Sequence, residues 1–128
     1  MLNNGYGDIA AAGLTVTPKR SEKVDFTIPY LTHVNEIAVT RDNSFNPEDK
    51  YDLSGLKIWV RESSSYFDSL NSLNKELKDK GQKKVKIKIV DENIETESIL
   101  EMIDSGAVSA TIADSHIAKI WAEVLPDI

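Results

Sequence analysis

The fold is decided by residues Leu56–Val90, which read LKIWVRESSSYFDSLNSLNKELKDKGQKKVKIKIV. The opening LKIWVR is rich in β-branched and aromatic residues and predicts a strand. The following segment, to about Lys80, carries one apolar stripe and predicts a helix that Gly81 ends. Val85–Val90 alternates apolar and charged residues and predicts another strand. The stretch therefore indicates a strand–helix–strand unit of a parallel sheet.

The same alternation continues to the end of the chain. Apolar spacing predicts helices over Glu95–Ser105 and Ser115–Val124, with a strand over Val108–Ala113 between them. From Leu56 onward the order is β-α-β-α-β-α, so the expected fold class is α/β with a doubly wound, mostly parallel sheet. Such sheets bind ligands where strands lead into helices, which here means the loops Glu62–Ser65 and Ala113–Ser115.

The first part of the chain is less regular. Asp8–Val16 predicts a strand of small residues, and Thr17-Pro18 begins a short helical turn, because proline fits a first turn. Val24–Tyr30 reads as extended and Glu36–Arg41 as a strand. Asp42–Asp52 is polar and predicts a surface loop.

Composition excludes several functions. The 128 residues have a net charge of -6, which argues against a nucleic-acid partner, and the lysines of Lys75–Lys88 suit a solvated face. The absence of cysteine excludes disulfides, a thiolate zinc site and a cysteine nucleophile. No metal-ligand motif or cofactor motif is present, so neither a metal nor a cofactor is expected. No apolar run is long enough to span a bilayer, and no signal peptide is visible.

The predicted strand-to-helix loops hold the candidate site residues. Ser63, Ser64 and Ser65 offer hydroxyl and N–H groups for an anion at a helix start, or simply cap the helix. Ser65 with Asp68 resembles a capping box. Asp114, at the next such loop, is either a helix cap or a carboxylate for a ligand ammonium.

Signals for catalysis are weak. His116 has Asp114 and Ser115 beside it, but adjacency in sequence is not the geometry of a triad. Glu92 belongs to an acidic group whose spacing suits a wet helix face. Among the aromatic residues, Tyr66 is expected in the core, as are Trp59 and Trp121, and Tyr30 is a weak candidate for a pocket wall.

Residues Gly5–Tyr30, GYGDIAAAGLTVTPKRSEKVDFTIPY, resemble the segment of type II periplasmic solute-binding proteins (bacterial extracellular solute-binding family 3) that carries the ligand carboxylate site. The resemblance implies that Gly13, Thr15 and Arg20 bind an amino-acid carboxylate, and a guanidinium fork suits that role. It also implies that Ser64 and Ser65 contact the same carboxylate, with Ser63 as a neighbour. Asp114 is implied to hold the α-amino group.

The second half narrows the resemblance. Asp91–Ile128, DENIETESILEMIDSGAVSATIADSHIAKIWAEVLPDI, is similar to the solute-binding domain of membrane-bound lytic murein transglycosylase F and its relatives. In those proteins the module precedes a lysozyme-like catalytic domain that cleaves peptidoglycan. Plain amino-acid transport receptors usually carry an acidic residue where this chain has Ser109, and this difference disfavours a plain receptor.

The resemblance implies a domain organisation and a function. Residues 1–35 are expected to be a remnant of lobe one with a hinge near Leu31–Asn35, and residues 36–128 an incomplete lobe two. The expected function is a non-catalytic sensor module for an amino acid or peptide-like ligand, in the periplasm or cell envelope. The alternatives are the receptor of an amino-acid ABC transporter, or a module that itself contributes catalysis. Expected partners are the missing part of lobe one, a C-terminal catalytic domain and, through exposed strand edges, a second copy.

Overall fold

The computed structural model describes residues 2–41, 45 and 47–128, and divides the chain into two units. The first unit is Met1–His33 and the second is Val34–Ile128. Their boundary falls inside the predicted hinge Leu31–Asn35, and the assignment of the units to two lobes stays a prediction. His33, the last residue of the first unit, has φ 58, which is uncommon for a residue with a side chain.

The first unit contains two short helical elements, η1 (Leu2–Asn4) and α1 (Pro18–Ser21). Thr17 caps α1, since its Oγ1 accepts a hydrogen bond of 3.3 Å from the main-chain N–H of Arg20. Pro18 occupies the first turn, where its missing N–H costs no hydrogen bond. The predicted helical turn at Thr17-Pro18 is therefore confirmed.

The predicted strand over Asp8–Val16 is wrong. Among the described residues of the first unit there is no strand, and Ile9 is 86% exposed. A strand is stable only when a neighbour satisfies its main-chain N–H and C=O groups, and no segment that the structure describes pairs with this one. Val24–Tyr30, which is predicted to be extended, likewise forms no strand.

The second unit is the α/β body of the chain. Its elements are β1 (Glu36–Thr40), η2 (Lys50–Leu53), β2 (Lys57–Arg61), α2 (Ser65–Asp79), β3 (Lys86–Val90), α3 (Thr96–Asp104), β4 (Ala110–Asp114) and α4 (Ser115–Ala122). The predicted strands and helices are confirmed with small shifts at their ends. Of the predicted loop Asp42–Asp52, residues 42–44 and 46 lie outside the described residues, and its last part enters η2.

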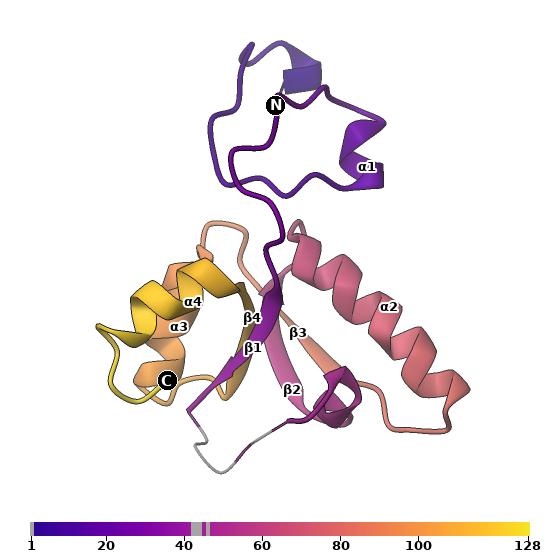
Figure 1. Cartoon of the computed structure of the whole chain (residues 1–128), viewed down its shortest axis with the longest axis vertical. Helices are drawn as coiled ribbons and strands as arrows, with labels where there is room; N and C mark the ends of the chain where they lie inside the picture. Colours follow the sequence, from indigo (N-terminus) through magenta and orange to yellow (C-terminus); the bar gives the residue numbers. More distant parts are fainter. Residues whose placement is uncertain (1, 42–44, 46) are drawn as a thin grey trace. The chain divides into compact units, whose positions relative to one another are not determined.

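The strands form one mixed sheet in the order β1-β4-β2-β3. β2 is parallel to both β3 and β4, and β1 is antiparallel to β4. Helix α2 covers one face of the sheet, while α3 and α4 cover the other (Figure 1). Helices on both faces of a mostly parallel sheet confirm the predicted doubly wound α/β fold.

Each face of the sheet has its own apolar core. Leu70, Leu73 and Leu77 of α2 pack with Ile58 and Val60 of β2 on one face. A second cluster on the opposite face contains residues of α3 and β4 together with Val39 and Val90: Ile99, Leu100, Ile103 and Ala113. Side chains of successive strand residues point to opposite faces, so one strand supplies both cores.

The start of α2 differs from the prediction by one residue. Ser64, not Ser65, is the N-cap, because its Oγ accepts a 3.3 Å hydrogen bond from the N–H of Phe67. The capping box predicted for Ser65 and Asp68 is therefore wrong. Gly81 has φ 70 just after the helix, which confirms it as the stop, since glycine adopts this conformation without steric cost.

Candidate functional site

The sheet topology brings four strand ends to one edge. β2, β3 and β4 run in parallel, so Arg61, Val90 and Asp114 end at the same edge. β1 runs in the opposite direction and begins there, with Glu36 opposite Asp114. The two loops predicted to hold the ligand, Glu62–Ser65 and Ala113–Ser115, therefore both lie at this edge, which we call the carboxyl edge.

Asp114 occupies the N-cap position of α4 but does not act as a side-chain cap. Its backbone is extended, with φ -64 and ψ 138, and its side chain makes no capping hydrogen bond. Its main-chain N–H instead donates to the phenolic oxygen of Tyr66 at 3.2 Å. The residue is half-buried. The alternative prediction was that the Asp114 carboxylate caps the helix. The structure shows that it does not.

Tyr66 connects the two loops of the carboxyl edge. It lies in the first turn of α2, its ring belongs to the core on that face, and only 8% of the residue is exposed. Burial, followed by the negative charge of Asp114, raises the pKa of Tyr66 to about 12. The predicted core position is confirmed, and the hydroxyl group at the end of that core residue reaches the site.

The loop Ser63–Ser65, which we call the serine loop, forms hydrogen bonds with nearby residues of the chain. Ser64 Oγ donates to the main-chain carbonyl of Arg61 at 2.7 Å, in addition to capping α2. Ser63 donates from its N–H to Glu92 Oε1 at 3.1 Å and from its hydroxyl to Glu92 Oε2. Ser65, the first residue of α2, is half-buried. Ligand contacts by Ser64 and Ser65 stay a prediction.

Glu92 contacts the loop of Ser63, which the sequence did not indicate. It had been placed on a wet helix face, but it precedes α3 and lies in the connection from β3. The hydrogen bond from the Ser63 hydroxyl is the largest cause that lowers the pKa of Glu92. Nearby, Arg61 Nη1 and Glu95 Oε2 form an ion pair of 2.7 Å. The donors of Ser63 are thus already used by a carboxylate of the chain itself.

The Ser63–Glu92 contact predicts a change in titration. Ser63→Ala removes the hydroxyl donor, so the pKa of Glu92 should rise toward its ordinary value of about 4.3. A lowered carboxylate pKa stabilises the fold above the ordinary pKa, and this contribution is lost as pH falls through the lowered pKa. A side-chain carbonyl NMR titration measures the shift. An unchanged Glu92 midpoint in Ser63→Ala would contradict the contact.

In the first unit, two pairs of predicted residues lie close together. Arg20 Nη1 donates to the main-chain carbonyl of Thr15 at 2.9 Å. A Cβ added at Gly13 would lie 3.6 Å from the hydroxyl of Tyr30. The structure thus brings Arg20 to Thr15 and Gly13 to Tyr30, and the ligand role of these residues stays a prediction.

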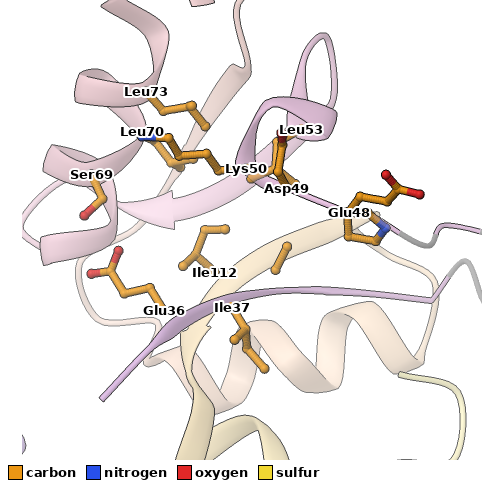
Figure 2. A pocket seen from close by; sticks show the side chains of 12 residues that line it. Glu36, Ile37, Glu48, Asp49, Lys50, Leu53, Ser69, Leu70, Leu73 and Ile112 are labelled. Carbon is orange, nitrogen blue, oxygen red and sulfur yellow. The ribbon is translucent and has the colours of Figure 1, made fainter. Parts of the chain in front are cut away.

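A separate groove of about 470 Å³ lies beside β1 in the second unit (Figure 2). Its apolar wall includes Leu70, Leu73 and Ile112, and Glu36 and Glu48 lie toward its two ends. None of the predicted ligand-binding residues lines it. The groove is therefore not the site that the sequence predicts.

Two further features, a metal-binding cluster and a membrane-spanning helix, are absent from the part of the chain that the structure describes. Within residues 2–41, 45 and 47–128, no three histidine, aspartate or glutamate side chains are grouped to hold a metal ion. Across the same residues, no helix has the length and apolar character needed to cross a membrane.

The second unit has the α/β fold of the modules found in solute-binding proteins, with two strand-to-helix loops at its carboxyl edge. Residues 1–84 match the bacterial extracellular solute-binding proteins, family 3. The match covers more than half of the chain, and the chain belongs to this family.

Proteins named membrane-bound lytic murein transglycosylase F are similar in sequence to almost the whole of this chain. The one from Saccharophagus degradans is 34% identical over 94% of this chain and 23% of its own length. The one from Maricaulis maris is 36% identical over 99% of this chain and 26% of its own length. The chain therefore spans about a quarter of each of these relatives.

Solved structures of amino-acid-binding proteins are similar in fold. An ancestral arginine-binding protein bound to arginine has a TM-score of 0.77 and 27% identity, over 98% of this chain and 51% of its own. The ancestral amino acid-binding protein AncCDT-1, a precursor of cyclohexadienyl dehydratase, has a TM-score of 0.72 and 28% identity, over 95% and 50%. These structures and the family match confirm the type II solute-binding fold.

Proposed function

We propose that the chain is a non-catalytic module that binds an amino acid or a small peptidoglycan-derived ligand bearing an ammonium group. The observation that carries the proposal is the state of Asp114. Its carboxylate lies at the carboxyl edge, is half-buried and does not cap α4. A carboxylate in that position can accept hydrogen bonds from an ammonium group, and such charge-assisted bonds are strong.

The serine loop supports the same choice of ligand group. Ser63 gives both its N–H and its hydroxyl to Glu92, so these donors already face a carboxylate. Glu92 and Asp114 bring negative charge to the edge, which would attract a ligand ammonium group, while Ser64 and Ser65 are proposed to contact the ligand carboxylate. The proposal therefore assigns the ammonium group to Asp114. Carboxylate binding by Arg20 and Thr15 is proposed for the first unit by itself, because a guanidinium group matches a carboxylate in two hydrogen bonds.

The named relatives suggest where the module works. We propose that it is the sensor or regulatory domain of a longer protein similar to lytic murein transglycosylase F, acting in the periplasm or cell envelope. The alternative is the substrate-binding receptor of an amino-acid ABC transporter. Proteins of similar fold bind arginine or amino acids, which is compatible with either role.

The location of the ligand is tested by NMR on the 128-residue chain. Amide resonances are followed as L-arginine, L-glutamine or L-alanine is added to millimolar concentration, which also reveals weak binding. The amides of Ser63–Ser65 and Asp114–Ser115 are expected to shift together. Shifts confined to Leu70, Leu73 and Ile112 would place the ligand in the groove beside β1 and contradict the proposed site. An absence of shifts with every amino acid would contradict the proposed function.

The regulatory role needs the longer protein. If the module is a sensor, the rate at which that protein solubilises peptidoglycan should change when the bound amino acid is added. An unchanged rate, with binding shown by calorimetry, would favour the transport receptor. Light scattering of the 128-residue chain tests the expected dimer: a particle of twice the monomer mass is the result that pairing of exposed strand edges requires.

A further inference from the structure

The contact between Tyr66 and Asp114 joins two loops that are far apart in the sequence. Tyr66 belongs to the first turn of α2, and Asp114 ends β4. The hydrogen bond of 3.2 Å from the Asp114 N–H to the Tyr66 oxygen crosses from one loop to the other. The tyrosine ring is buried in the core beneath α2, so its oxygen has a fixed position relative to the sheet.

The hydroxyl group has one further capacity. A phenol donates one hydrogen bond and accepts others at its oxygen. The Asp114 N–H uses the oxygen as an acceptor, which leaves the hydroxyl hydrogen for a nearby acceptor. Burial, followed by the nearby negative charge of Asp114, raises the pKa of this phenol. The phenol thus meets Asp114 through the main-chain N–H of that residue.

We infer that Tyr66 is the positioning residue of the ligand site: its hydroxyl oxygen accepts the hydrogen bond of the Asp114 N–H and so fixes the main chain that carries the Asp114 carboxylate at the carboxyl edge. The inference rests on the proposed role of Asp114 as the partner of the ligand ammonium group. When the main chain that carries a carboxylate is already fixed, less conformational freedom is lost on binding, so the contact with Tyr66 increases affinity. Tyr66 itself need not touch the ligand.

The contact is tested first without a ligand. Tyr66→Phe keeps the buried ring and removes only the hydroxyl, so the Asp114 amide hydrogen should exchange faster with solvent. Tyr51→Phe is the matched control, since Tyr51 is also a hydrogen-bonded phenol, which donates to Glu76, but at η2. Faster exchange at Asp114 in Tyr66→Phe alone supports the contact. Equal exchange in both variants would overturn the inference.

The positioning role is tested by affinity for L-arginine, measured by NMR on the same chain. Tyr66→Phe should bind about 3- to 10-fold more weakly, the range for one neutral hydrogen bond, and Tyr51→Phe should bind normally. In an Asp114→Asn background, Tyr66→Phe should cost less than it does alone, because the two residues act through one contact. Normal affinity in Tyr66→Phe would overturn the positioning role.

The two tests separate the inference from the function on which it rests. If the unmutated chain binds no amino acid, the proposed function fails and the ligand role of Tyr66 fails with it. The exchange measurement then still decides whether Tyr66 holds Asp114. If the chain binds L-arginine and Tyr66→Phe leaves both affinity and exchange unchanged, only the inference about Tyr66 fails.

Discussion

Leu100→Ala is expected to lower the free energy of unfolding by about 2–5 kcal/mol, the range for removing a large buried aliphatic side chain. Leu100 lies in α3, is 0% exposed and belongs to the core between the sheet and the helices α3 and α4. Alanine would leave a cavity that the packed helices and strands cannot fill completely. Urea denaturation followed by circular dichroism measures the change.

The matched control for this substitution is Ile120→Ala. Ile120 is also a large aliphatic residue on a helix of the same face, but it is 62% exposed. Its replacement is expected to change the free energy of unfolding by no more than about 0.5 kcal/mol. A loss below about 1 kcal/mol for Leu100→Ala would show that the two-core description of the second unit is wrong.

Asp114→Asn is expected to weaken the binding of an amino acid by about 1.5–3 kcal/mol, the range for a hydrogen bond to a charged group. Asparagine keeps the size of the side chain and removes the charge that the ammonium group would face. Stability should change little, because the Asp114 carboxylate makes no capping bond and asparagine occupies N-cap positions well. Affinity by calorimetry or NMR, together with the melting temperature, gives both quantities.

Asp79→Asn is the control for the loss of one negative charge. Asp79 is exposed at the end of α2, whereas Asp114 lies at the carboxyl edge. Normal binding by Asp79→Asn and weak binding by Asp114→Asn would show a local effect. If Asp114→Asn binds normally and melts earlier, Asp114 has a structural role and the proposed site is misplaced.

The second unit could be predicted from the sequence because its signals are local. Apolar residues at helical spacing in Ser65–Asp79 and the alternation in Lys86–Val90 each record which face of the element is buried. The strand predicted for Asp8–Val16 failed because its small apolar residues suit a strand only where a partner strand exists. The cap of α2 shifted by one residue, since consecutive serines offer equivalent hydroxyl groups.

The site could be predicted only in part. Parallel topology brings Ser63 and Asp114 to one edge, and their positions at strand ends indicated this. The contacts of these residues could not be predicted, because the partners are far apart in the sequence. Tyr66 and Asp114 are separated by 48 positions, and Ser63 and Glu92 by 29. Such pairs depend on the three-dimensional register of helices and strands, which a local pattern does not contain.

We propose that the carboxyl edge of the second unit recognises a ligand ammonium group through Asp114. It is tested most directly by comparing L-arginine with Nα-acetyl-L-arginine in NMR titrations of the 128-residue chain. Acetylation removes the α-ammonium charge and leaves the side chain intact. L-Arginine is predicted to shift the amides of Ser63–Ser65 and Asp114–Ser115, and the acetylated form is predicted to leave them unchanged at the same concentration. Equal shifts with both compounds would contradict the account.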